Sequence, residues 1–244
     1  MRASVTLATA RRILTQLRHD PRTVVLLIGV PSILMILLRY VLNSAPAFSA
    51  VAPALLGIFP FTIMFLLTSI TTLRERTGGT FERLMTLPIG RLDLLCGYAL
   101  AFGLLALVQV GVAVTVCLAW LGLDLAGPVW TLLLITVLDA LLGTALGLFV
   151  SAFARTEFQA VQFMPVFVLP QFLLCGLFVP RESMGWALRW LSDVLPLSYA
   201  VDALTQVTRS GAIDGTLLRD MLVVAGCAVL ALVLGAATLH RRTP

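Results

Sequence analysis

The side chains that could do chemistry in this chain are few, and their types exclude most enzymatic functions. All 17 of its lysine-plus-arginine residues are arginine, because the sequence contains no lysine. A phosphate-binding P-loop needs a lysine on the β- and γ-phosphates, and a Schiff base needs a lysine amine. We therefore expect no ATP hydrolysis by this chain alone and predict no catalytic residue in it.

The residue types that bind metals show no ligand spacing. Two histidines, His19 and His240, stand at opposite ends of the chain beside arginines, where surface positions near lipid headgroups are expected. The cysteines stand singly in apolar runs, so we interpret them as small core residues. They are Cys96, Cys117, Cys175 and Cys227. No metal site is predicted.

One carboxylic acid, Asp139, lies in the middle of an apolar run. A charged side chain there costs roughly 2.5 to 3.5 kcal/mol on insertion scales. Gly143 and Gly147 form a GxxxG spacing, which allows close helix approach. We expect Asp139 at a helix contact, protonated or hydrogen-bonded; a proton-carrying or substrate-contacting carboxylate is the alternative. The small or polar stripe of this run contains Thr136, Asp139, Ala140, Gly143 and Gly147.

The elements that must position these groups are membrane helices. The chain is 59% hydrophobic and 12% charged, with a mean hydropathy of +1.02, whereas soluble domains are roughly half apolar and a quarter charged. Long unalternating runs in lipid form helices, and about 20 residues cross the hydrocarbon. We predict an all-α integral membrane protein, one domain over 1–244 with no room for a soluble catalytic domain. The six candidate spans are 24–42, 51–73, 94–121, 130–152, 159–179 and 218–239.

The arginines are distributed unevenly about these spans. Twelve of the 17 fall in the N-terminal stretch, the 74–91 loop, position 155 and the C-terminal end. Arginine-rich loops stay inside the cell, so both termini are predicted to be cytoplasmic. The N-terminal stretch has no apolar core followed by a small-residue cleavage site, so the first span is expected to remain in the mature protein.

Two flanking segments have amphipathic patterns. Residues 1–22 are expected to form a cytoplasmic helix lying flat at the headgroup surface, although a mere topogenic charge cluster is the alternative. Its apolar stripe is Leu7, Ala10, Leu14 and Leu17, and its polar stripe is Arg11, Thr15, Arg18 and Arg22. Residues 180–217 are too apolar for an open loop and carry Trp186 and Trp190 one turn apart, which suits an outer re-entrant or interfacial segment. Pro165 and Pro170 indicate that the preceding span kinks or re-enters.

The 74–91 loop carries a short helix signal between two apolar spans. Gly79 or Thr80 can cap this helix, and Pro88 ends it. An apolar knob of Phe81, Leu84 and Met85 is flanked by Glu82 and Arg83. Such a knob with a charged rim fits a docking surface, and packing back under the membrane domain is the alternative.

The loop resembles a known family. Arg74-Glu75-Arg76, Gly79 to Leu84 and Leu87-Pro88 look like the first cytoplasmic loop of type-2 ABC export permeases. These are the membrane subunits of daunorubicin-resistance-type drug exporters and of lipopolysaccharide and teichoic acid exporters. The resemblance covers nearly the whole chain, including the stretch from Pro196 to Ala203 before the last span.

The resemblance implies partners and roles. The loop helix is then a coupling helix that sits in a groove of a separate ATPase subunit, which binds ATP and magnesium; this chain holds no cofactor. A dimer of permeases, identical or homologous, with two ATPases in the plasma (inner) membrane of a prokaryote is implied, and nucleic acid is not expected. Thr77 departs from the family, where an acidic residue is frequent at this place. The residues implied in ATPase coupling are Glu75, Gly79, Thr80, Phe81, Glu82, Arg83 and Leu84.

In that family the second and fifth spans face the twofold axis and line the cargo route. The chain then moves a hydrophobic or amphiphilic compound outward. A proton-coupled carrier using Asp139, an exporter of a lipid-linked glycan and a non-transporting membrane partner are the alternatives. The substrate-lining residues implied by the resemblance are Phe61, Phe65, Gln162, Phe163 and Phe167.

Overall fold

The computed structural model describes residues 3–78, 91–211 and 213–238, and within them every regular element is helical. Six of the helices are long and apolar enough to cross a membrane. The elements are α1 (Ala3–Arg18), α2 (Pro21–Leu42), α3 (Ala45–Thr77), α5 (Arg91–Thr115), η1 (Val116–Trp120), α6 (Val129–Val150), α7 (Glu157–Leu174), η2 (Arg181–Ser183), α8 (Trp186–Val194), α9 (Pro196–Arg209) and α10 (Gly215–Thr238).

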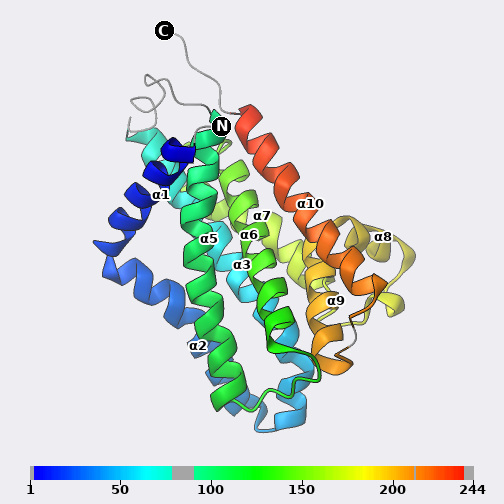
Figure 1. Cartoon of the computed structure of the whole chain (residues 1–244). Coiled ribbons are helices and arrows are strands. Elements are labelled where there is room, and N and C mark those ends of the chain that lie inside the picture. Colours follow the sequence, from blue (N-terminus) through cyan, green and yellow to red (C-terminus); the bar gives the residue numbers. More distant parts are fainter. Residues whose placement is uncertain (1–2, 79–90, 212, 239–244) are drawn as a thin grey trace.

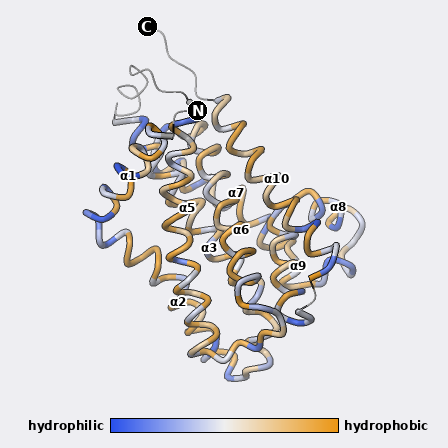
Figure 2. Tube along the Cα trace, viewed as in Figure 1, coloured by the Kyte–Doolittle hydropathy of each residue, from blue (hydrophilic) through white to orange (hydrophobic). Residues whose placement is uncertain are grey.

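The long helices form one bundle with two distinct ends (Figure 1). The end that carries α1, the end of α3 and the end of α10 is called here the terminal end. The opposite end, called the far end, contains the turn between α2 and α3 and the connection from η1 to α6. Hydrophobic residues cover most of the tube of the long helices, and hydrophilic residues gather toward α1 and around α8 and α9 (Figure 2). This pattern is that of a chain whose middle faces lipid.

The closest helix pair in the bundle is α3 with α6. A Cβ atom added at Gly143 would lie 2.3 Å from the Phe61 carbonyl oxygen, and one added at Gly147 would lie 2.1 Å from Thr68 Oγ1. The two backbones therefore touch without side chains between them, as the GxxxG spacing predicts. The Ser69 hydroxyl donates across this contact to the Gly147 carbonyl oxygen at 3.1 Å.

Helix α1 packs on α5 through a similar close approach. A Cβ atom at Gly97 of α5 would lie 2.6 Å from Thr9 Cβ of α1. This contact turns Ala10, Ile13 and Leu17 inward, whereas Leu7 is 60% exposed. Docking against α5 selects the i, i+3, i+7 face that contains Ile13, so only part of the predicted apolar stripe, Ala10 and Leu17, is buried against the bundle.

Helix α7 ends earlier than the sequence predicts. It continues through Pro165 and Pro170 and stops at Leu174, five residues before the predicted end of the span at 179. The chain then turns at Gly176, whose φ is +96°, a value that favours glycine. The apolar residues up to 179 belong to the approach to η2 and α8, not to the spanning helix.

The segment predicted as re-entrant folds into two short helices of different exposure. Trp186 and Trp190 of α8 are exposed, whereas α9 buries its apolar face against α3, α6 and α10. The Asp214 carboxylate then caps α10, accepting hydrogen bonds from the backbone N–H groups of Thr216 and Leu217 at 3.1 and 3.0 Å. The hydrogen bond from the Thr216 side chain, then those from the Leu217 backbone and the Gln206 side chain, lower the pKa of Asp214 to about 2.

The contact between α3 and α6 generates a stability prediction. Gly147→Ala is expected to destabilise the protein by about 1 to 3 kcal/mol, because the new methyl group collides with Thr68 and with the α3 backbone. Thermal unfolding in detergent should show a fall of about 5 °C in Tm. The matched control is Gly226→Ala in α10, where an added Cβ meets nothing within 4 Å. Equal melting temperatures of the two variants would contradict the packing.

Candidate functional site: a polar anchor at the base of the 79–90 loop

A buried polar cluster joins three helices at the terminal end of the bundle. Glu75, in the last turn of α3, is 5% exposed, and its Oε2 atom lies 2.8 Å from Arg12 Nη2 of α1. The buried Tyr98 hydroxyl of α5 donates to the same carboxylate oxygen. Arg12 Nη2 also donates to the Tyr98 hydroxyl oxygen at 3.2 Å. We call Arg12, Glu75 and Tyr98 the loop anchor.

The position of the loop anchor gives it mechanical importance. Residues 79–90 connect α3, which ends at Thr77, to α5, which begins at Arg91. Glu75 lies just before this connection, and Tyr98 lies two turns after it. The anchor therefore joins the end of α3 and the start of α5 to each other and to α1.

Two arginines of the same turn tie α3 to further elements. Arg74 donates two hydrogen bonds of 2.8 Å to the Glu157 carboxylate at the start of α7. Arg76 Nη1 donates to the Ser151 carbonyl oxygen after α6 at 3.1 Å. The Thr77 hydroxyl donates within its own helix, to the Leu73 and Arg74 carbonyl oxygens. The end of α3 is thus held by contacts to α1, α5, α7 and the end of α6.

Sequence reasoning found Glu75 but missed its partners. Arg12 is adjacent in sequence to Arg11 of the predicted polar stripe, and Tyr98 lies in an apolar span. One argument could have found Arg12. A glutamate at the end of a membrane helix needs a cationic partner if it is buried, and arginine is the cation this sequence offers. The other six residues predicted to couple to an ATPase, Gly79, Thr80, Phe81, Glu82, Arg83 and Leu84, lie outside the described residues.

The structure places Asp139 at the contact of three helices. Its side chain is 0% exposed, and neither carboxyl oxygen has a hydrogen-bond partner among the described residues. A Cβ atom built on Gly57 of α3 would lie 3.3 Å from Asp139 Oδ2 and within 4 Å of Val201 and Leu204 of α9. An unpaired carboxylate there would cost several kcal/mol, so the neutral acid is favoured.

The five aromatic or amide residues expected along a cargo route divide into two groups. Phe61 and Phe65 of α3 are fully buried. Gln162 and Phe167 of α7 are exposed, and Phe163 is partly buried. The ring centroids of Phe65 and Phe167 are 6.4 Å apart, so the buried Phe65 packs against the exposed Phe167. That these residues line a route for cargo stays a prediction.

Metal chemistry has no candidate centre in this part of the chain. No group of three histidine, cysteine, aspartate or glutamate side chains among the described residues could hold a metal ion. The four cysteines are free thiols and lie apart. The described polar clusters hold helices together and place charges; they contain no nucleophile paired with a base.

Six helices long and apolar enough to cross a membrane, with a polar anchor at the terminal end, define a multi-pass membrane protein. Comparison with known proteins gives the family. Residues 4–208 match the ABC-2 type transporter family, so the chain belongs to this family. The resemblance to type-2 ABC permeases inferred from the loop is thereby confirmed.

Several relatives carry informative descriptions. The chain is 27% identical over 181 residues to the probable multidrug ABC transporter permease YbhS of Escherichia coli K12, which is 74% of this chain and 48% of that protein. It is 27% identical over 158 residues to the linearmycin resistance permease protein LnrN of Bacillus subtilis, covering 62% and 40%. ABC transporter G family member 20 of Dictyostelium discoideum is 26% identical over 160 residues, covering 66% and 22%. Each match spans less than half of the relative.

The loop anchor generates a prediction about α1. Glu75→Gln removes the charge that holds Arg12 and is expected to destabilise the docking of α1 by about 1 to 2 kcal/mol. The value is below that of a fully buried pair because the Arg12 side chain is 34% exposed. Hydrogen exchange of the α1 amides should accelerate.

The control for this prediction is the exposed ion pair at the same end. Glu157→Gln breaks the ion pair with Arg74. The Arg74 side chain is 62% exposed and the Glu157 side chain is 52% exposed. Its effect on α1 exchange should be negligible, since ion pairs between exposed side chains contribute little to stability. Equal acceleration in both variants would show that α1 is not held by the loop anchor.

Asp139 generates a second prediction. Asp139→Asn keeps the size of a neutral carboxylic acid, so the variant is expected to assemble with a Tm within about 2 °C of the parent. Asp139→Lys, which forces a charge into the same space, is expected to prevent assembly. Size-exclusion chromatography with a melting curve measures both. A large loss of stability in the Asn variant would show that the carboxylate form is required.

Proposed function

We propose that this chain is the membrane subunit of an ATP-driven exporter that moves a hydrophobic or amphiphilic compound outward. Energy comes from ATP and magnesium bound to a separate ABC ATPase, whose groove receives residues 79–84. The observation that carries the proposal is the loop anchor, because it joins the two helices on either side of the predicted docking loop to each other and to α1. The absence of lysine excludes a P-loop in this sequence. It agrees with ATP hydrolysis by another chain.

The anchor suggests how a pull on the loop would act. Glu75, Arg74 and Arg76 bind α3 to four other parts of the bundle. Closure of the ATPase would therefore shift the terminal end of α3 together with α1 and α5, not the loop alone. Packed helices respond to such forces by rigid-body shifts between discrete arrangements. The close contact of α3 with α6 would carry the shift into the membrane.

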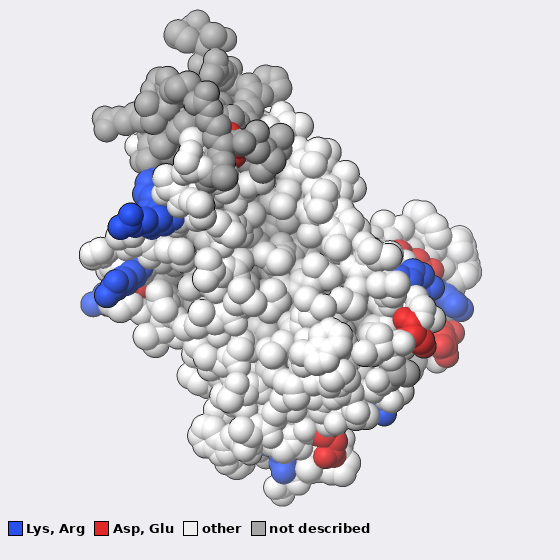
Figure 3. Space-filling view, in the orientation of Figure 1, with Lys and Arg blue, Asp and Glu red and all other residues white. Residues whose placement is uncertain are grey.

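The proposed assembly contains two permeases and two ATPases, and the terminal end faces the cytoplasm. Arginine side chains gather around α1 on the face shown in Figure 3, as expected for a cytoplasmic end. The exposed face of α7, which includes Gln162 and Phe167, is available to a second permease, identical or homologous. Cargo would pass between the two copies along α3 and α7, in the inner membrane of a prokaryote.

The descriptions of the relatives support a small amphiphilic cargo. One relative is described as a linearmycin resistance permease and another as a probable multidrug permease. An exposed aromatic residue such as Phe167, backed by Phe65, suits a bulky apolar molecule. We therefore place drug-like or lipid-like compounds ahead of glycans as the cargo.

Asp139 favours one competing function. A carboxyl that is buried without a partner is the group a proton-coupled carrier would use. Such a carrier would transport down a proton gradient without an ATPase. The two functions therefore differ in a single observable, the energy source.

Reconstitution in liposomes tests the proposal. The purified permease is combined with the ABC ATPase that co-purifies with it, and export of a fluorescent amphiphile is followed. Export is expected only with both chains and ATP. Phe81→Ala is expected to weaken the association by about tenfold or more, the effect of losing an interface hot spot.

Controls separate coupling from folding in this experiment. Phe153→Ala removes a phenylalanine that is 54% exposed after the end of α6, and it should leave association and export unchanged. The permease alone could instead transport the amphiphile down a proton gradient and lose this transport in Asp139→Asn. That result would refute the ATP-driven proposal and support the proton-coupled carrier. Full export in Phe81→Ala would refute the docking role of the loop.

A further inference from the structure

A cavity with a volume of about 1020 Å³ lies beside α8 and α9, away from the loop anchor. Its walls come from the start of α3, the chain after α7, η2, α8, α9 and the start of α10. The volume is at the upper end of the range for sites that bind drug-sized molecules, roughly 300 to 1,000 Å³. We call it the α8/α9 cavity.

The α8/α9 cavity has an apolar part and a charged part. Ala50, Val51 and Ala54 of α3 supply one wall, and Leu177 and Val223 add to it. The remaining walls carry four arginines and three acids, and mixed charges gather over this region of the surface in Figure 3. An apolar wall beside a charged one matches a molecule with a tail and an ionic head.

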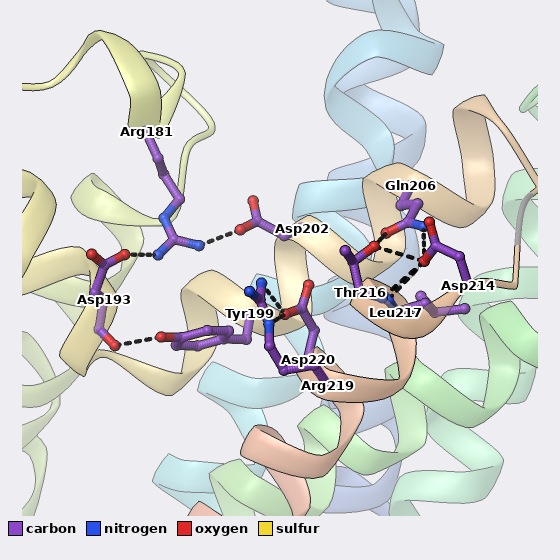
Figure 4. Close-up of polar contacts among 10 residues, drawn as sticks. All are labelled: Arg181, Asp193, Tyr199, Asp202, Gln206, Asp214, Thr216, Leu217, Arg219 and Asp220. Carbon is purple, nitrogen blue, oxygen red and sulfur yellow. Dashed lines mark hydrogen bonds and ion pairs between the residues drawn. The ribbon is translucent and has the colours of Figure 1, made fainter.

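The acidic side chains in the cavity are incompletely paired, although four arginines line the same walls. One guanidinium, that of Arg181, is shared between Asp193 of α8 and Asp202 of α9 (Figure 4). The Arg181 guanidinium also lies over the Tyr199 ring, 5.2 Å from its centroid. Burial raises the pKa of Asp202, and the charge of Arg181 only partly opposes this. Glu182, next to Arg181, has no partner among the described residues.

The basic charges in the cavity are also incompletely paired. Arg219 donates to Asp220 at 2.8 and 3.0 Å. Arg189 of α8 and Arg209 of α9 are exposed and pair with no side chain in the described part of the chain. The walls therefore present free guanidinium groups and free carboxylate charge together. A ligand with one charge satisfies one sign and meets repulsion from the other.

We propose that the α8/α9 cavity binds the headgroup of a zwitterionic amphiphile that carries a phosphate diester and an ammonium group. The phosphate pairs with Arg189 and Arg209, because guanidinium groups bind phosphate oxygens with charge-assisted hydrogen bonds. The ammonium group neutralises the excess carboxylate charge of Glu182 and of the pair that shares Arg181. The acyl or alkyl tail lies on the α3 wall.

The surroundings of the cavity fit a headgroup. Trp186 and Trp190 of α8 are 87% and 66% exposed. Exposed tryptophans in membrane proteins mark the level of the lipid headgroups. The same helix contributes Arg189 and Asp193 to the cavity. The charged walls therefore stand at the depth where phosphate and ammonium groups of lipids lie.

Three probes with one tail and different heads test this inference. They are dodecylphosphocholine, dodecyltrimethylammonium and dodecyl phosphate, titrated at equal mole fraction into the permease in uncharged dodecyl maltoside micelles. The phosphocholine is expected to bind about tenfold more tightly than either the cationic or the anionic probe. Equal binding of the three, or a preference for the cationic or the anionic probe, would overturn the inference.

Two variants of unpartnered, exposed residues give opposite shifts without breaking any contact of the fold. Arg209→Gln is expected to weaken phosphocholine binding about tenfold and to favour the trimethylammonium probe. Glu182→Gln is expected to favour dodecyl phosphate instead. The control is Arg155→Gln, an exposed arginine near the terminal end, which should change nothing. A shift in Arg155→Gln equal to that in Arg209→Gln would reduce the effect to overall charge and refute the site.

A zwitterionic amphiphile in the cavity can be a resident membrane lipid or the exported cargo, and both carry the same headgroup chemistry. Native mass spectrometry of the complete assembly with ATP separates them, because cargo is released during turnover whereas a resident lipid stays bound. Binding of the probes needs no ATPase. Failure of the proposed export function would therefore leave this site intact, and failure of the site would leave the coupling through residues 79–84 untouched.

Discussion

The bundle is organised by the contact in which the backbone of α3 lies directly against the glycines of α6. Any side chain at Gly143 or Gly147 would occupy the space of the α3 backbone. In lipid, where no hydrophobic force drives helices together, such close packing is a main source of helix association. Hydroxyl groups reinforce the contact, because Thr68 and Ser69 of α3 bond to carbonyl oxygens of α6.

Helix α3 connects all the sites described above. It has 33 residues, a length of about 50 Å at 1.5 Å per residue, whereas the hydrocarbon core is about 30 Å thick. Both of its ends therefore extend into polar surroundings. Glu75 holds the loop anchor at one end, Gly57 touches Asp139 in the middle, and Ala50 lies in the wall of the α8/α9 cavity. Because α3 is one continuous helix, a movement at either of its ends can be transmitted along it to the other end.

Charged side chains are paired to different degrees at the terminal end, in the middle of the bundle and around α8 and α9. The loop anchor is compact, because Arg12 and Tyr98 both bind the Glu75 carboxylate. Asp139 has no hydrogen-bond partner among the described residues and sits where ionisation is most costly. Around α8 and α9 several charges face a cavity without full pairing. Paired charges suit a rigid connection, whereas unpaired charges beside open space suit an exchangeable ligand.

The sequence by itself determined the class of protein, the six spans and the close helix contact through Gly143 and Gly147, because hydropathy and small-residue spacing are local properties of the chain. Only the tertiary structure decided the partners of Glu75, which lie 63 and 23 residues away at Arg12 and Tyr98. It also decided that Ile13, not Leu7, faces inward, and where α7 ends. These features depend on which faces of distant helices meet, and periodicity within one helix carries no information about its neighbours.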